Sequence, residues 1–186
     1  DPLLFRLAML ADQPRLAEVL QRAARLGEWD GGRPGSGQGL ALVRMEAFGD
    51  SENAGGGRIA CVAQARLAAG GLKVDRLTAV VDIGRIVNLD IARQQIEGGL
   101  LFGVGLAAGG AAHYVKGLPE PGRLSGLRLP TLASAPEVVV EFLASSAVPF
   151  DPGELGVAVA APAIANALFA ATGLRFRSLP LLAGEP

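Results

Sequence analysis

A single carboxylate stands between glycines in the segment Asp151–Gly173, DPGELGVAVAAPAIANALFAATG. Glu154 lies between Gly153 and Gly156, and no charged residue follows it within the segment. A carboxylate set against an uncharged, apolar segment loses hydration, which suits it to act as a general base. The alternative interpretation is a turn or capping acid that lies near a helix N-terminus because of the helix dipole.

A second segment that could contribute to a functional site is Asp82–Gly110, in which Gln95 precedes a run of glycines. The glycines are Gly98, Gly99, Gly103 and Gly105. Each glycine in a helix costs about 1 kcal/mol relative to alanine, so close approach of another backbone or of a flat ligand is the expected reason for them. Gln95 shares a helical face with Gly98 and Gly99, and its amide suits a heterocycle or an oxo group. Tight helix packing with Gln95 at the rim is the equal alternative.

Composition sets limits on these sites. The 186 residues are 50% apolar and include 26 glycines, which is typical of a globular chain. The net charge of −1 gives no indication of nucleic acid or an anionic membrane as a partner. One cysteine, Cys61, and one histidine, His113, exclude an internal disulfide, a cysteine-ligated iron–sulfur cluster and a multi-histidine zinc site within this chain. We interpret Cys61 as a core residue and His113 as structural.

Two features concern the context of the chain. It begins with Asp1 and shows no basic-then-apolar signal segment, so we interpret it as a fragment or a processed piece. Leu155–Leu174 is long enough to span a bilayer, but its many alanines, with Pro162 and Asn166, favour a buried core helix.

Periodicity along the chain predicts an α+β fold. Two helices open the chain, and Gly27 ends the second. The expected strands are Leu40–Phe48, Arg58–Ala68, Leu72–Ile83, Ala111–Val115, Leu124–Leu129, Pro136–Ser145 and Arg175–Leu182. We expect residues 1–30 to form a helical pair that makes one structural unit with residues 31–186.

The remaining helices and faces follow from local signals. A helix is predicted near Ile91, capped by Asn88 or Asp90, and an alanine-rich helix is predicted to open at Pro162 and to end at Gly173. Alternation in the second and third strands predicts two sets of residues that each share a side of the sheet. The sets are Ile59, Cys61, Ala63 and Ala65, and Val74, Thr78, Val80 and Asp82.

Several motifs together resemble the molybdenum hydroxylases, the xanthine dehydrogenase and aldehyde oxidase family. They are similar to the molybdopterin-binding large subunits of the isoquinoline 1-oxidoreductase type. The motifs are QIEGG at Gln95–Gly99, GELGVAVAAPAIANALFAATG at Gly153–Gly173, DIGRIVN at Asp82–Asn88, the helices of Asp1–Leu20 and RFRSLPL at Arg175–Leu181. They occur in the family's order over nearly the whole chain. The resemblance implies that residues 31–186 are the C-terminal portion of a molybdopterin-binding domain.

The resemblance also implies a reaction. The family hydroxylates an aldehyde or a carbon of an aromatic heterocycle with oxygen from water, and a molybdenum–pterin cofactor accepts the two electrons. Glu154 then corresponds to the base that deprotonates the metal-bound hydroxyl. Gln95 corresponds to the glutamine beside the cofactor, with Gly98, Gly99 and Gly153 in the same layer; no side chain of this chain is expected to ligate the metal.

Departures from the family pattern define what else is expected. Asp151 and Leu155 replace the glycine and proline that flank the family's glutamate, Leu89 replaces a proline, and the upstream glycine-rich cofactor segments are absent. GSGQG at Gly35 does not replace them and is interpreted as a connector. The cofactor, in its cytosine dinucleotide form, is therefore expected to be bound mainly by segments outside this chain.

The expected partners are the remainder of the subunit, an iron–sulfur electron-transfer subunit and a small-molecule substrate; formation of a homo-oligomer is left open. The alternative is an isolated, non-catalytic fragment or assembly module without metal, and the isolated chain is expected to be inactive. The sequence leaves cytoplasmic and periplasmic locations open.

Overall fold

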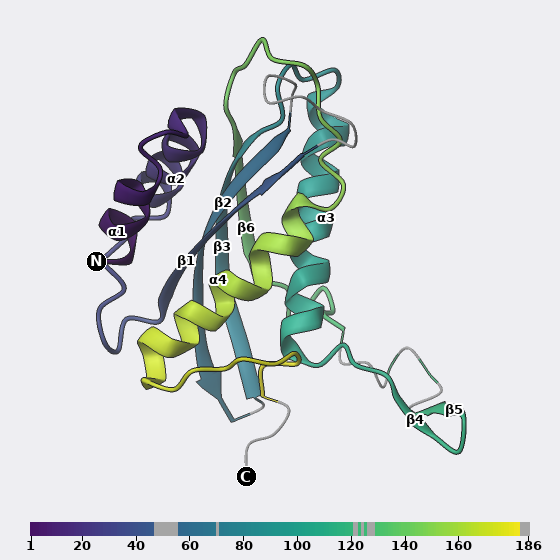
Figure 1. The fold of residues 1–186 in the computed structure, drawn as a ribbon. Coiled ribbons are helices and arrows are strands. Elements are labelled where there is room, and N and C mark those ends of the chain that lie inside the picture. Colours follow the sequence, from purple (N-terminus) through teal and green to yellow (C-terminus); the bar gives the residue numbers. More distant parts are fainter. Residues whose placement is uncertain (47–55, 70, 121–122, 124, 126–128, 183–186) are drawn as a thin grey trace.

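The fold belongs to the α+β class, as the sequence predicts, and its described residues form a four-stranded sheet, four helices and a small hairpin (Figure 1). The computed structural model describes residues 1–46, 56–69, 71–120, 123, 125 and 129–182. The helices are α1 (Pro2–Met9), α2 (Pro14–Leu26), α3 (Leu89–Ala108) and α4 (Leu155–Thr172). The strands are β1 (Gln38–Met45), β2 (Gly57–Ala68), β3 (Gly71–Asp82), β4 (His113–Val115), β5 (Leu118–Glu120) and β6 (Glu137–Phe142).

The large sheet has the strand order β1-β2-β3-β6. Its first three strands are antiparallel neighbours, whereas β6 pairs parallel to β3 after the crossover through α3. Helices α3 and α4 cover one face of the sheet, and α1 and α2 lie on the other side (Figure 1). The sheet is therefore the middle layer between two helical layers of unequal size.

Each face of the sheet has its own apolar cluster. The larger cluster joins β2 and β3 to α3 and α4 through residues such as Ile59, Leu100 and Ile164. The smaller one joins α2 to the opposite face through Leu20 and Val62. Alternate residues of a strand point to opposite faces, so β2 serves both clusters, and Ile59, Cys61, Ala63 and Ala65 share one face as predicted.

The predicted face of β3 is wrong in its first half. Val74 lies in the larger cluster and Val80 in the smaller one, although the sequence alternation placed them on the same side. The pairing of β2 with β3 shifts register between Gln64 and Ala65. When one strand of a pair has one extra residue, the side chains beyond that residue point to the opposite faces of the sheet, and this explains the error.

Helix α4 begins at Leu155, seven residues before the predicted start at Pro162. Pro162 lies inside the helix, and its side chain is exposed to solvent. Gly173 ends the helix, as predicted, and has the left-handed backbone conformation. The apolar contacts of α4 with β1, β2 and α3 outweigh the local cost of the proline. Because α4 starts early, Glu154 is its N-cap residue rather than a loop residue distant from the helix.

The predicted pairing of the hairpin is wrong, and so is the predicted last strand. Strand β4 pairs with Leu118–Glu120 across the turn at Lys116–Gly117, so the hairpin is tighter than predicted. Of the predicted partner Leu124–Leu129, residues 124 and 126–128 lie outside the described residues. The segment Arg175–Leu182 forms bends and turns rather than a strand, and its contact with α3 includes one backbone bond from Leu181 N to Ala107 O at 2.9 Å.

Among the described helices, α4 alone has the length and apolar composition to cross a membrane. In the fold it is instead the central helix of the larger cluster, with Leu155, Ile164 and Leu168 fully buried. The sequence prediction of a buried core helix therefore agrees with the structure.

Candidate functional site

Helix α3 presents Gln95 to solvent. Asn88 caps the helix, because its Oδ1 accepts a hydrogen bond from Ile91 N at 3.0 Å. Ile96 and Leu100 on the inner face are fully buried, which fixes the rotation of the helix and leaves Gln95 on the exposed face. The Gln95 amide makes no hydrogen bond with another described residue, so its donor and acceptor atoms are free for a ligand.

The glycines of α3 divide into two kinds. A Cβ atom added at Gly99 would lie 3.3 Å from both Gly156 Cα and Val157 N, and one added at Gly103 would lie 2.6 Å from Ala160 Cβ. These two glycines let α3 and α4 approach closely, which is the packing alternative. Gly98 is different, since a Cβ there would meet no atom of a described residue within 4 Å. Gly98 therefore lies open on the same exposed side of the helix as Gln95.

Glu154 is exposed at the first turn of α4. Its side chain makes no capping hydrogen bond, and its backbone has the helical angles φ −101° and ψ −9°. The preceding turn is held by the Asp151 carboxylate, whose Oδ1 accepts from Gly153 N at 3.0 Å. Among the described residues no side chain forms an ion pair with Glu154. The fold positions this carboxylate without assigning it a structural partner.

The sequence-predicted site residues gather where the middle of α3 meets the start of α4. Gly99 lies against Gly153, with its virtual Cβ 3.5 Å from Gly153 O. A cleft of about 390 Å³ runs between Gln95 and the segment that leads to Glu154. Its other lining residues include Ile83, Val87, Ile91, Phe150, Asp151 and Pro152. Arg85 and Asn88 complete the polar lining with Gln95 and Asp151, and Glu154 follows two residues after Pro152 without lining the cleft itself.

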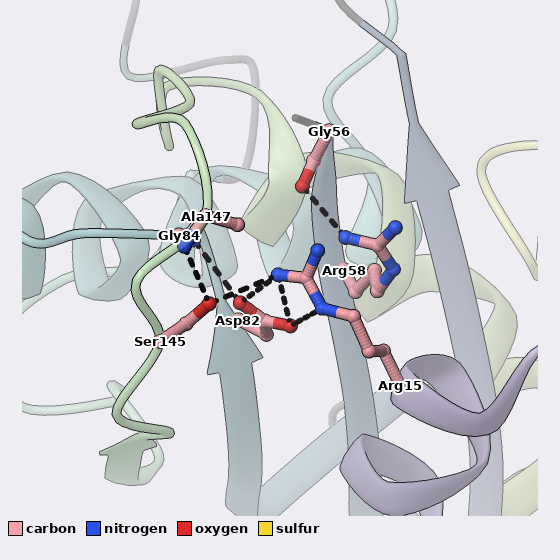
Figure 2. Close-up of polar contacts among 7 residues, drawn as sticks. All are labelled: Arg15, Gly56, Arg58, Asp82, Gly84, Ser145 and Ala147. Atoms are coloured by element: carbon pink, nitrogen blue, oxygen red, sulfur yellow. Dashed lines mark hydrogen bonds and ion pairs between the residues drawn. The ribbon is translucent and has the colours of Figure 1, made fainter. Parts of the chain in front are cut away.

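A second carboxylate, Asp82, lies close by, and both of its oxygens accept hydrogen bonds (Figure 2). Arg15 on α2 donates from Nε to Oδ2 at 2.9 Å and from Nη2 to Oδ1 at 2.7 Å. Gly84 N donates to Oδ1 at 3.0 Å. Asp82 is 3% exposed, and a buried charge needs compensating partners. The two-bond contact with Arg15 and the Gly84 amide provide them.

The contacts of Arg15 extend to the segment that precedes Glu154. Arg15 Nη2 also donates to Ser145 Oγ at 3.2 Å, and that oxygen accepts from Ala147 N at 3.3 Å (Figure 2). Backbone bonds continue the connection, from Arg85 N to Ala147 O and from Phe150 N to Ile83 O, both 2.9 Å. We call residues 82–85 and 145–150, together with Arg15, the clamp. It links α2, the end of β3 and the entrance to α4.

Gly84 is required by the clamp. Its φ is +70°, and a Cβ there would meet Val148 O at 2.2 Å, so the two segments pass with no room for a side chain. Arg58 lies beside the clamp and donates from Nη1 to Gly56 O at 3.0 Å (Figure 2). Partial burial lowers the pKa of the Arg58 guanidinium, and the positive charge of Arg15 lowers that pKa further.

Sequence reasoning included Asp82 in a motif but did not identify its role. Its partner Arg15 lies 67 residues away, and the pairing depends on where α2 packs. Burial in the core raises the pKa of the Cys61 thiol to about 12, which agrees with its predicted role as a core residue. His113 lies exposed on the β4–β5 hairpin. Among the described residues, no three His, Cys, Asp or Glu side chains cluster closely enough to hold a metal ion.

Comparison with known proteins gives consistent matches. A family model described as the molybdopterin cofactor-binding domain matches residues 36–136. Isoquinoline 1-oxidoreductase subunit beta of Brevundimonas diminuta is 30% identical over 183 residues, covering 97% of this chain and 23% of that subunit. A membrane-bound aldehyde dehydrogenase of Gluconacetobacter polyoxogenes, whose name specifies pyrroloquinoline quinone, is 37% identical over 123 residues, covering 65% of this chain and 16% of that protein.

Solved structures give the same result. The aldehyde oxidoreductase from Desulfovibrio gigas matches with a TM-score of 0.58 at 27% identity, covering 68% of this chain and 14% of that one. The resemblance inferred from the sequence motifs is thereby confirmed, as is the α+β class. The chain spans less than a quarter of the length of each of these proteins.

Proposed function

The chain belongs to the molybdopterin cofactor-binding domain family, and we propose on this premise that it is one part of a molybdenum-dependent hydroxylase. The complete protein oxidises an aldehyde or an N-heterocycle with water as the source of oxygen. The observation that carries the proposal is the Glu154 carboxylate, which has no partner among the described residues and stands at the start of α4 where that helix packs against α3 at Gly99, four residues after Gln95. The names of the relatives, an isoquinoline oxidoreductase and an aldehyde oxidoreductase, support the substrate classes.

Glu154 is proposed as the general base. Its carboxylate oxygen takes the proton from the water-derived oxygen that attacks the substrate carbon. A base for this step must be free of structural partners and must be fixed in place, because general base catalysis requires hydrogen-bond reach to one proton. The rigid start of α4 supplies the position, and the absence of an ion pair with any described residue leaves the carboxylate free. Closure of the cleft by the rest of the subunit would exclude water from this point.

Gln95, Gly98, Gly99 and Gly153 are proposed to form the surface against which the cofactor lies. The open space at Gly98 and the free amide of Gln95 support direct contact with a ligand. Gly99 contributes indirectly, since it allows α4 to approach and so brings Glu154 beside the same surface. The cofactor, when bound, accepts the two electrons released by the substrate.

The residues present fit a cofactor that contacts this chain but is bound mainly by other parts of the protein. The described part of the chain has no cluster of metal-ligating side chains, yet it offers an open glycine and a free amide on α3 and a free carboxylate at the start of α4, where the two helices meet. We therefore propose that a molybdenum–molybdopterin cofactor, in its cytosine dinucleotide form, is bound mainly by segments outside this chain. The pyrroloquinoline quinone in the name of one relative belongs to that protein.

The proposed partners are the remainder of the molybdopterin-binding subunit and an iron–sulfur subunit that carries electrons away. Exposed apolar side chains beside the cleft support a covering partner, since Val87 is 84% exposed and Ile91 is 55% exposed. We further propose that residues 1–30 and 31–186 fold as one unit, because α2 packs on the sheet and Arg15 holds Asp82.

The test is turnover and metal content in the complete complex, measured for the wild type, Glu154→Gln and Glu120→Gln. Elemental mass spectrometry is expected to find about one molybdenum per complex in all three, because neither change removes a cofactor contact. Glu154→Gln is expected to lower the turnover by about 10²–10⁴-fold, as the loss of a general base does. Glu120 is exposed on the distant hairpin and serves as the matched control.

Two outcomes would contradict the proposal. Near-native turnover of Glu154→Gln would show that Glu154 is not the base. A purified protein with no molybdenum, whose mass equals this chain alone, would support the alternative of a non-catalytic fragment or assembly module.

A further inference from the structure

A second cavity lies at the other end of α4 from Glu154. It has a volume of about 350 Å³ and is bordered by the start of α1, the loop after α2, the start of β1 and the last turn of α4. Helix α4 has 18 residues, so its two ends are about 27 Å apart. This cavity is therefore separate from the cleft beside Gln95.

Two arginines, Arg6 and Arg175, line this cavity. Arg6 is partly buried and donates from Nη1 to the backbone oxygen of Pro2 at 3.0 Å. Arg175 donates from Nη1 to Asn166 Oδ1 at 3.3 Å, and its guanidinium lies 3.4 Å from the centroid of the Phe169 ring. These contacts hold each guanidinium in place, and each has only one of its five N–H groups engaged in a hydrogen bond with a described residue.

The two positive charges are not neutralised within the described part of the chain. No described carboxylate lies within ion-pair distance of Arg6 or Arg175. Burial lowers the pKa of the Arg6 guanidinium, and the charge of Arg175 lowers that pKa further. The two like charges repel each other, and an anion bound in the cavity would relieve that repulsion.

The other polar groups of the cavity already make hydrogen bonds. Asn166 Nδ2 donates to Leu40 O at 3.0 Å, and Trp29 Nε1 donates to Asp1 Oδ1 at 3.2 Å. The Gln38 amide accepts from Asp30 N and donates toward backbone oxygens of the same loop. One N–H of Asn166 remains, and the largest number of free donors belongs to the two guanidinium groups.

Asp1 is the one acid among the described residues that line the cavity. Its Oδ1 accepts from Leu3 N at 2.6 Å as well as from Trp29, so this carboxylate is engaged in capping α1. Two positive charges against one negative charge leave the cavity net positive. The aromatic side chains of Phe5, Trp29 and Phe169 border it and reduce the screening of that charge by water.

From these observations we infer that Arg6 and Arg175 form a binding site for a single oxyanion group, a carboxylate or a phosphate. The planar guanidinium fork matches both groups in two-bond geometry. The anion comes either from a free small molecule or from an acidic side chain of the remainder of the subunit. The site is distinct from the proposed catalytic residues, so its test does not depend on turnover.

The first arm of the test measures binding of inorganic phosphate to the complete complex at constant ionic strength, by equilibrium dialysis with labelled phosphate. The wild type is compared with the double variant Arg6→Gln/Arg175→Gln and with Arg33→Gln. Arg33 is exposed, lies in the neighbouring loop and does not line the cavity, so it is the matched control. Loss of two charge-assisted contacts is expected to weaken phosphate binding by at least about tenfold in the double variant alone.

The second arm addresses an anion supplied by the protein itself. In that case the wild type does not bind added phosphate, and the double glutamine variant has a lower thermal unfolding midpoint than the Arg33→Gln control. The double variant Arg6→Lys/Arg175→Lys keeps both charges without the two-bond geometry and is expected to recover part of that midpoint, which a purely packing role of the arginines does not predict. Phosphate binding that is equal in the wild type and the double glutamine variant overturns the inference. So does an absence of phosphate binding combined with unchanged midpoints, or with a loss that is equally large in the glutamine and lysine double variants.

Discussion

Asp82 and Glu154 are carboxylates at the same end of the sheet with opposite environments. Asp82 is 3% exposed and accepts hydrogen bonds from Arg15 and from Gly84 N. Glu154 is exposed, makes no capping bond and forms no ion pair with any described residue. Two backbone bonds, from Arg85 N to Ala147 O and from Phe150 N to Ile83 O, connect their two segments.

The comparison separates two uses of a negative charge. A buried carboxylate whose oxygens are all engaged holds elements together, because breaking one contact leaves a charge without compensation. A carboxylate that the fold positions but does not pair keeps its oxygens available for a proton. The clamp thus fixes the entrance to α4, and Glu154 is carried on the element that is fixed. This division predicts opposite effects of substitutions at the two acids.

The largest expected effect is on turnover at Glu154. Glu154→Gln is expected to leave the thermal unfolding midpoint of the complex within a degree or so of the wild type, since exposed sites without partners contribute about 0.5 kcal/mol or less. The same variant is expected to lose about 10²–10⁴-fold in turnover. Paired activity and melting measurements check this, and a large loss of stability would show that the carboxylate has a structural partner after all.

At Asp82 we expect the main effect of a substitution to be on stability rather than on turnover. Asp82→Ala is expected to destabilise the fold by roughly 2–4 kcal/mol, because Arg15 and the Gly84 amide lose their acceptor. The loss of stability is smaller than for a fully buried ion pair because the Arg15 side chain is 37% exposed. Denaturant unfolding measures the loss, with Asp75→Ala as the control, since Asp75 pairs with Arg66 at the exposed end of the sheet and should cost less than about 1 kcal/mol. Equal losses at the two positions would remove the structural role assigned to the clamp.

The sequence identified Glu154 more readily than it did the role of Asp82, and the reason is physical. The signal for Glu154 is local, because a lone acid between glycines before an apolar helix is visible in a few residues. The role of Asp82 depends on Arg15, 67 residues away, and thus on how α2 packs. The same distinction explains the errors in the fold. The early start of α4 and the inverted face at Val74 follow from tertiary contacts and a register shift that local patterns do not encode.

The glycines of α3 extend the comparison to positions without charge. Gly99→Ala is expected to destabilise the fold by about 1–3 kcal/mol, because the new Cβ would lie 3.3 Å from backbone atoms of Gly156 and Val157, which cannot move independently of α4. The shift also displaces Glu154, so turnover should fall together with the unfolding free energy. Denaturant unfolding and activity assays on the same preparation check both effects. A neutral result would indicate that the two helices separate easily and that Gly99 is not needed for their approach.

Gly98→Ala is the smallest and most discriminating change. A Cβ at Gly98 meets no atom within 4 Å in the part of the chain that the structure describes, so alanine should stabilise the helix by roughly 0.5–1 kcal/mol through its better helix propensity. If Gly98 faces the cofactor, as proposed, the same methyl group should lower the molybdenum content or turnover of the complex despite the more stable fold. A rise in unfolding free energy with a fall in molybdenum content would place a ligand over Gly98. A rise in stability with full metal content and turnover would show that the space above Gly98 is solvent, and the proposed cofactor surface would then be limited to Gln95 and the start of α4.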